Sequence, residues 1–232
     1  MIELEMLDRV GMAWAQAQVK AQHYLHAPVD VRSMPEGYAV HVEGVGRIGV
    51  LLFGRPEATR CYPFYGSVQD VQSGRCEETR WQVLNLARVW LDPQVQRGGA
   101  FYGPEWLPGF VDRRGVWRST LASSAVGLAV ERIGYDYLMR RPPCFLDEPY
   151  ELRWCLSYCS NWLHKGTLYS ASRFGRYRVN KRGLETWRIW LPALTAEQDL
   201  DIQRAAEIHP RSKAMRARRE SGLAGVQLNF QV

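Results

Sequence analysis

The sequence has no CxxC pair and an odd number of cysteines. The five are Cys61, Cys76, Cys144, Cys155 and Cys159. This pattern excludes a disulfide framework and a zinc finger, so we expect reduced thiols. Two groups come near a metal-ligand set, His23 with His26, and Cys155 and Cys159 with His164. Neither group is complete, and we predict no metal site.

The chain also lacks long apolar runs, a signal peptide and internal repeats. Its longest apolar runs, such as Ile48–Phe53, are far too short to span a bilayer, and the start Met1–Glu5 is acidic. We therefore expect a soluble, cytoplasmic protein without a membrane partner. The 232 residues, 46% of them hydrophobic, are enough to bury a good core. We predict one main domain over residues 1–195 and a basic helical extension over residues 196–232.

The stretch from Tyr150 to Phe174 has the pattern of a strand, a polar turn and a helix. One face of the strand carries the large apolar residues Leu152, Trp154, Leu156 and Tyr158, and the other carries Arg153, Cys155, Ser157 and Cys159. Ser160 and Asn161 favour the start of a helix that continues through Ala171. Ligand sites in open α/β sheets lie at the carboxyl ends of strands, which predicts a site at this turn. Its candidate residues are Ser157, His164, Thr167 and Tyr169.

The other elements follow from periodicity and capping residues. A stripe at helical spacing, Leu4, Leu7, Val10 and Trp14, predicts a first helix. Further patterns predict a hairpin over 38–43 and 47–53, a strand over 81–91, a helix over 121–140 capped by Ser119, a hairpin over 177–181 and 185–191, and a helix begun by a capping box at Thr195. Residues 54–80 are expected to be irregular. This order predicts an α/β (α+β) fold, a mixed sheet with helices on both faces.

Positive charge is concentrated late in the chain. Residues 173–219 hold twelve basic and five acidic residues, against a net charge of +6 for the whole chain. Such a surface favours a polyanion, and double-stranded DNA first, although a charge run of this kind is often only a solvated tail. The candidate DNA contacts are Arg173, Arg176, Arg178, Lys181, Arg182, Lys213 and Arg216. Tyr65, Trp106 and Trp117 lie in loop-like segments and are candidates to stack on a base or to pack in the core.

Three further groups are candidates for binding a substrate or donor. Arg88 would lie among large apolar side chains, either paired with a carboxylate or aimed at an anionic ligand. Arg97, Gly98 and Gly99 form a loop that could wrap phosphate or simply turn the chain. Small residues at the start of the 121–140 helix, including Ser123 and Ser124, would let a ligand approach the free N–H groups, although tight packing on the sheet would need the same residues.

The element order resembles the GNAT-type N-acetyltransferases. The resemblance is carried by Leu168–Phe174, which is similar to the segment where that family has a helical tyrosine followed five positions later by phenylalanine. It implies a mostly antiparallel central sheet, a catalytic domain over residues 1–195, and Tyr169 as general acid. Arg173 stands where the family usually has glycine, and Gln96–Ala100 matches the pyrophosphate loop loosely. The implied cofactor is acetyl-CoA or another acyl or aminoacyl donor.

A narrower resemblance is to the phage Mom family of DNA-modification proteins. It is carried by Asn85–Trp90, Leu121–Ser123, Ser157–Ser160 and His164–Ala171. It implies conversion of adenine in DNA to its N6-carbamoylmethyl form, which protects phage or mobile-element DNA from restriction. Ser160 stands where the family typically has Asp, so the candidate general base becomes His164.

The resemblances and the chemistry together give each candidate residue a role. Tyr169 would donate a proton, and Ser123 and Ser157 would hydrogen-bond substrate or donor. The remaining candidates for binding substrate or donor are Asn85, Arg88, Ser124, Gly166 and Thr167. Two alternatives stay open: an acyl-CoA-dependent transferase acting on a small amine or protein, and a DNA-binding protein without catalysis. The oligomeric state, with a homodimer as one option, also stays open.

Overall fold

A computed structural model describes most of the chain. The described residues are 1–23, 25–30, 33, 35–56, 64–96, 109–111, 113, 117–141, 151–160, 166–181 and 183–210. They fall into two compact units, one of residues 1–134 and 151–192 and the other of residues 135–150 and 193–232. The sheet and all the candidate site residues that are described below belong to the first unit.

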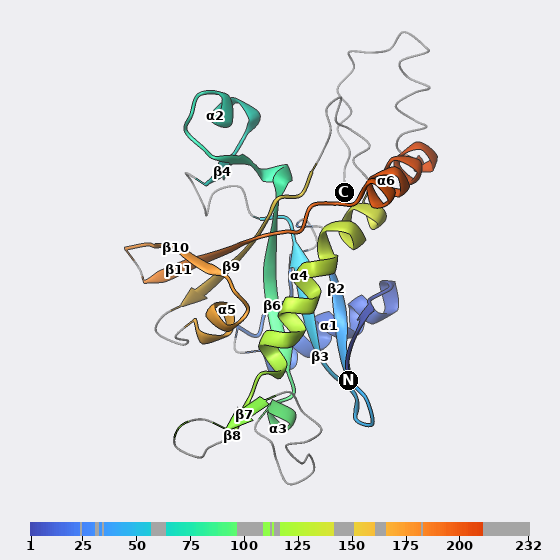
Figure 1. Cartoon of the computed structure of the whole chain (residues 1–232), viewed down its shortest axis with the longest axis vertical. Helices are drawn as coiled ribbons and strands as arrows, with labels where there is room; N and C mark the ends of the chain where they lie inside the picture. The colour runs from blue at the N-terminus through green and yellow to red at the C-terminus, as the bar shows by residue number, and fades with distance from the viewer. Residues whose placement is uncertain are drawn as a thin grey trace. The chain divides into compact units, whose positions relative to one another are not determined.

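A seven-stranded sheet forms the centre of the first unit (Figure 1). Its strands are β1 (Ile2–Met6), β2 (Glu36–Val42), β3 (Gly46–Gly54), β6 (Val83–Leu91), β9 (Trp154–Ser160), β11 (Leu184–Trp190) and β10 (Gly175–Val179), in that spatial order. Every neighbouring pair is antiparallel except β6 with β9, which run parallel. The mixed, mostly antiparallel sheet predicted from the sequence is confirmed.

The described residues outside this sheet form helices and two small ribbons. The helices are α1 (Arg9–Gln22), α2 (Val68–Gln72), α3 (Pro93–Gln96), α4 (Leu121–Arg140), α5 (Thr167–Ala171) and α6 (Ala196–Ile208), with a 3-10 turn η2 at Arg80–Gln82. The ribbons pair β4 (Tyr65–Gly66) with β5 (Glu78–Thr79) and β7 (Gly109–Val111) with β8 (Trp117–Ser119). The predicted helix over 121–140 is therefore confirmed, as is the capping box of Thr195 at α6.

Helices cover both faces of the sheet, and the strands β2 and β3 are buried on both of their faces along most of their length. On one face, α1 packs Ala15 and Val19 against Ala39 and Val50. On the other face, which is nearer the viewer in Figure 1, α4 crosses the strands, and the Arg132 guanidinium lies over the Tyr38 ring. Tyr38 and Ala39 are neighbours on β2, so their side chains point to opposite faces and each meets a different helix.

Four predictions about individual elements and their bounds were wrong. Residues 2–6 form a strand rather than the start of a helix, since Leu4 pairs with Val40 of β2, and the helix begins only after the cap at Asp8. The helix after β9 begins at Thr167, with Gly166 as its N-cap, whereas Ser160 still belongs to the strand. Ser119 lies in β8, one residue too early to cap α4. Residues 54–80, expected to be irregular, contain α2 and two short strands.

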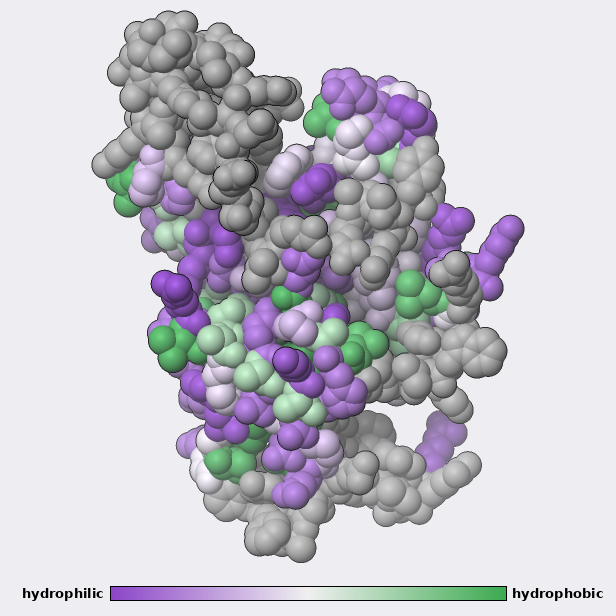
Figure 2. Space-filling view, turned by 180° about the vertical axis from the view of Figure 1, so that it is seen from behind, coloured by the Kyte–Doolittle hydropathy of each residue, from purple (hydrophilic) through white to green (hydrophobic). Residues whose placement is uncertain are grey.

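The surface of the described residues mixes polar and apolar side chains. Seen from behind, apolar residues lie in small groups separated by polar ones (Figure 2). Among the described residues, none of the helices has the length and apolar character that crossing a membrane requires.

Candidate functional site

The parallel strands β6 and β9 pair over only three residues each. The register joins Val83 to Trp154, Leu84 to Cys155 and Asn85 to Leu156. Beyond these pairs, β6 continues to Leu91 and β9 to Ser160 without further pairing in the described register. We call the place where the pairing ends the β6/β9 fork, bounded by residues 86–91 of β6 and 157–160 of β9.

A bulge in β6 accounts for the fork. Leu52 of β3 pairs with Arg88 and Phe53 pairs with Leu86, which leaves Ala87 as an extra residue in β6. A bulge bends its strand and increases its twist, and it can end pairing with the neighbour on the other side. The Leu86 carbonyl next to the bulge accepts a hydrogen bond from the Ser157 hydroxyl at 3.0 Å. A side chain thus makes the last link between the strands.

The fork brings together backbone groups that the ladders do not use. β9 is paired along its whole length with β11 on its other edge, and β6 is paired with β3. The edges that face the fork therefore present N–H and C=O groups for which the described strands provide no ladder partner. Such edges can accept an extended ligand as they would accept another strand.

Tyr169 lies beside the fork. It belongs to the five-residue helix α5, and its half-buried ring lies between Phe174 and Trp187, with centroid distances of 5.8 and 5.9 Å. The hydroxyl donates to the carbonyl of Tyr158 at 3.5 Å, which is a long hydrogen bond. Because Tyr158 directly follows Ser157, the phenol oxygen is placed where the two strands part.

Gly166 fixes the entry into α5. Its φ of +66° lies in the left-handed region, and a Cβ at this position would overlap the ring of Trp187. The absence of a side chain therefore allows the chain to turn tightly against β11 and to place Tyr169 three residues later. Thr167, another predicted binding residue, is exposed on the first turn of α5.

The two cysteines of β9 are buried beside this site as protonated thiols. Burial raises the pKa of the Cys155 thiol to about 12 and also raises the pKa of Cys159. The Gly166 N–H acts in the opposite direction on Cys159 but is the smaller effect. Cys76 and Cys155 are buried free thiols. Neither cysteine of β9 is prepared to act as a nucleophile, because the thiolate is the reactive form.

This burial gives a labelling prediction. At about pH 8, iodoacetamide should modify Cys155 and Cys159 far more slowly in the folded protein than in guanidinium chloride, since both burial and the raised pKa values limit thiolate formation. Peptide mass spectrometry after timed quenching measures both rates. Equal rates in the two states would contradict the buried placement of these thiols.

The N-terminal turn of α4 lies on the same face as α5. The Ser172 hydroxyl, just after α5, donates to the Leu168 carbonyl at 2.8 Å and lies 3.4 Å from the Ser123 carbonyl. The Ser123 hydroxyl donates to the Thr120 carbonyl at 2.9 Å, and Ser124 is half-buried beside it. Because these side chains are small, they do not cover the N-terminus of α4. This end of the helix lies near α5, which carries Tyr169, and it favours a negatively charged group.

Other predicted site residues have different surroundings. Arg88 is half-buried and donates to the carbonyls of Ala27 and Ala87, at 3.2 and 2.7 Å. Tyr65 is fully buried and packs in a core cluster with Phe64, which leaves no ring face for a base in this conformation. Asn85 lies at the fork. The following lie outside the described residues: Arg97, Gly98, Gly99, Trp106, His164, Arg182, Lys213 and Arg216; Trp117 is described only as part of the β8 backbone.

Four predicted DNA contacts lie close together in sequence after Tyr169. Arg173, Arg176, Arg178 and Lys181 are all exposed, on or beside β10, the edge strand of the sheet. Arg176 is within 3.4 Å of the Glu185 carboxylate, which neutralises part of this charge. Arg173 has a φ of +65°, a left-handed conformation that non-glycine residues rarely adopt. The conformation explains why glycine is the usual residue at this position in the family that the sequence resembles.

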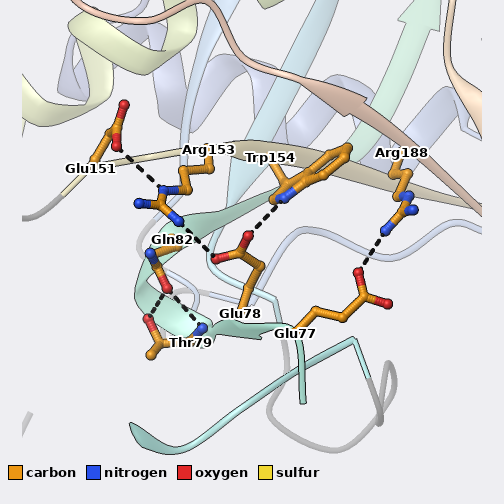
Figure 3. Close-up of polar contacts among 8 residues, drawn as sticks. All are labelled: Glu77, Glu78, Thr79, Gln82, Glu151, Arg153, Trp154 and Arg188. Carbon is orange, nitrogen blue, oxygen red and sulfur yellow. Dashed lines mark hydrogen bonds and ion pairs between the residues drawn. The ribbon is translucent and has the colours of Figure 1, made fainter. Parts of the chain in front are cut away.

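A polar and aromatic cluster holds the 64–79 segment against β9, β10 and β11 (Figure 3). Glu77 accepts hydrogen bonds from Arg188 and from the Tyr177 hydroxyl, at 3.0 and 2.9 Å. The Arg188 guanidinium also lies over three rings, those of Phe64, Trp154 and Tyr177, at 5.1, 4.7 and 4.3 Å. Burial, and next the hydrogen bond to Glu77, raise the pKa of Tyr177.

Glu78 supplies the buried end of the same cluster. Its carboxylate accepts from the Trp154 indole N–H at 3.1 Å and lies 3.8 Å from the Arg153 guanidinium. Sequence reasoning missed this cluster, since its partners are 76 to 111 residues apart along the chain and no local pattern joins them. The cluster supports the strand that carries Ser157. No group of three or more potential metal ligands occurs among the described residues.

Comparisons with known proteins find solved structures of acetyltransferases that are similar to this chain. No protein-family profile and no curated protein matches the chain. Solved structures to which it is similar include spermidine N-acetyltransferase from Vibrio cholerae in complex with CoA and spermine (10% identity, 86% of this chain, 98% of that chain, TM-score 0.42). Another is the Campylobacter jejuni N-acetyltransferase PseH in complex with acetyl coenzyme A (12% identity, 83% of this chain, 100% of that chain, TM-score 0.39). A third is Tetrahymena GCN5 (10% identity, 83% of this chain, 98% of that chain, TM-score 0.41). The narrower resemblance to the Mom family stays a prediction.

Proposed function

We propose that this chain is an N-acyltransferase-type enzyme, which moves a small acyl group from an acyl-CoA or related donor to an amine at the β6/β9 fork. The observation that carries the proposal is the fork itself, where two strands expose unpaired backbone edges beside the hydroxyl of Tyr169. The extended arm of CoA contains amide groups, which can pair with such edges as an added strand does.

The start of α4 fits the charged end of such a donor. The helix is 20 residues long, and its first turn has no acidic residue and carries the small side chains of Ala122, Ser123 and Ser124. Free N–H groups and the helix dipole together favour phosphate at this position. The link from Ser172 to Ser123 keeps this end on the same face of the sheet as Tyr169.

Each residue at the fork has its own role in the proposed reaction. A bound donor would supply an activated carbonyl carbon for the amine to attack. Tyr169 would give its proton to the departing group, since its hydroxyl lies where the two strands part. Ser157, 1% exposed, holds β6 and β9 at the point where they part, and we assign it a positioning role. His164 remains the predicted general base.

Adenine in DNA is the narrower candidate for the amine. The exposed basic residues Arg173, Arg176, Arg178 and Lys181 follow Tyr169 on the edge of the sheet, where they would meet the phosphates of a duplex. The exocyclic amine of adenine is reached only after the base leaves the stack. The motifs shared with the Mom family, including Ser157 and Tyr169, support this acceptor over a small amine.

Two measurements test the proposal. Calorimetric titration of the purified protein with CoA tests the donor. Nucleoside mass spectrometry of plasmid DNA from cells that express the protein tests the acceptor, with Tyr169→Phe as the negative control. A new adenosine species absent from the control would establish DNA modification, and its added mass would identify the transferred group. CoA binding with unchanged nucleosides would favour a small amine, while binding of no CoA with unchanged nucleosides would overturn the proposal.

A further inference from the structure

Asn85 carries a buried polar atom without a partner. Among the described residues, three buried side-chain nitrogen or oxygen atoms make no hydrogen bond: Nε of Arg55, Nε of Arg80 and Oδ1 of Asn85. The two arginines lie with their guanidinium groups over the ring of Trp81, at 5.4 and 4.7 Å, so stacking accounts for their positions. A buried amide oxygen of this kind calls for an explanation, and a bound ligand is one.

The position of Asn85 relates this oxygen to the fork. Asn85 pairs with Leu156 in the last residue pair of β6 and β9, directly before the Leu86 carbonyl that Ser157 holds. Side chains alternate along β9, so Leu156 and Ser157 point to opposite faces of the sheet. Ser157 is opposite Trp187, which contacts Tyr169, whereas Leu156 packs with Phe64 and Tyr65. Asn85 shares the face of Leu156.

We propose that the Asn85 carboxamide oxygen accepts a hydrogen bond from the N–H of the acceptor amine. The inference rests on the proposed transfer at the fork. The helix N-terminus of α4 and Tyr169 lie on the other face and suit the donor, so the group that meets Asn85 is the second substrate. Asn85 then selects acceptors that carry an N–H. It stays unsatisfied in the free protein because that hydrogen bond forms only on binding.

Asn85→Leu separates this role from a structural one. Leucine has the same branched heavy-atom skeleton and lacks the buried acceptor, so the variant should be more heat-stable than the wild type, by about 2 to 4 °C. The matched control is Asn180→Leu, because the Asn180 carboxamide oxygen is satisfied by the Leu184 N–H at 3.0 Å. The control should melt at a lower temperature than the wild type, and Asn85→Ala serves as a second, smaller replacement.

Binding measurements complete the test, with CoA as the donor probe, and spermidine and a short adenine-containing duplex as amine probes. The proposal expects Asn85→Leu to bind CoA like the wild type and to bind the amine probe of the wild type about tenfold more weakly. A less stable Asn85→Leu protein, or unchanged amine binding, would overturn it. If the wild type binds an amine probe but no CoA, the proposed donor fails, while the amine titrations still decide the role of Asn85.

Discussion

Tyr169→Phe is expected to lower kcat about 10² to 10⁴-fold, the usual contribution of a general acid, while leaving donor binding and folding nearly unchanged. The structural reason is the environment of the hydroxyl. The hydroxyl lies where the two strands part, 3.5 Å from the Tyr158 carbonyl, and the ring contacts with Phe174 and Trp187 survive in phenylalanine.

The measurement is steady-state kinetics with the acceptor identified by the nucleoside and amine assays, together with melting temperature and CoA titration for each variant. Tyr135→Phe is the matched control, because that hydroxyl also makes one long hydrogen bond, to Asp201 at 3.4 Å, and belongs to no proposed site. A Tyr169→Phe enzyme with wild-type kcat would remove Tyr169 from the mechanism. A large drop in melting temperature would instead assign the residue to the core.

Gly166→Ala is expected to lower the melting temperature by about 4 to 16 °C and to reduce transfer strongly. Two effects add. An alanine in the left-handed region, here at φ +66°, costs about 1 kcal/mol, and the new Cβ would overlap the buried ring of Trp187, where overpacking costs about 1 to 3 kcal/mol. For a chain of this length, each kcal/mol lowers the melting temperature by about 2 to 4 °C. Relief of the overlap would move α5 and with it Tyr169.

Gly74→Ala is the matched control for this substitution. Gly74 has a φ of +70°, yet a Cβ there would meet nothing within 4 Å. It should therefore show only the backbone effect of about 1 kcal/mol and keep full activity. Differential scanning calorimetry of the two variants separates the overlap from the backbone strain. Equal shifts in both variants would mean that the contact with Trp187 does not constrain α5.

Local patterns predicted the elements in which apolar residues recur at a regular spacing. The alternation of Trp154, Leu156 and Tyr158 gave β9 its correct faces, and the apolar stripe with its terminal prolines gave α4 its bounds. Leu4 and Leu7 fit a helical spacing, but pairing with β2 decided the structure of residues 2–6. No local signal could show that tertiary preference, since β2 lies more than 30 residues further along the chain.

Local patterns also predicted part of the candidate site. Ser157 and Tyr169 are close in sequence, so the strand and helix between them predicted their proximity, and the structure brings both to the fork. The sequence could not decide between the alternatives for Arg88 and Tyr65, because the groups around them come from distant segments, as the bond from Arg88 to Ala27 shows. The bulge at Ala87 and the unsatisfied oxygen of Asn85 depend on register across three strands, which no single stretch of sequence contains.

The short pairing of β6 with β9 has a consequence for the cohesion of the sheet. It divides the seven strands into two antiparallel ribbons, β1-β2-β3-β6 and β9-β11-β10, whose backbone ladder is interrupted at the fork. A ligand whose amides bridge both edges would supply the missing backbone hydrogen bonds and connect the two ribbons. Its affinity would then appear as thermal stability, because a ligand that binds only the folded chain raises the free energy of unfolding in proportion to the logarithm of its concentration.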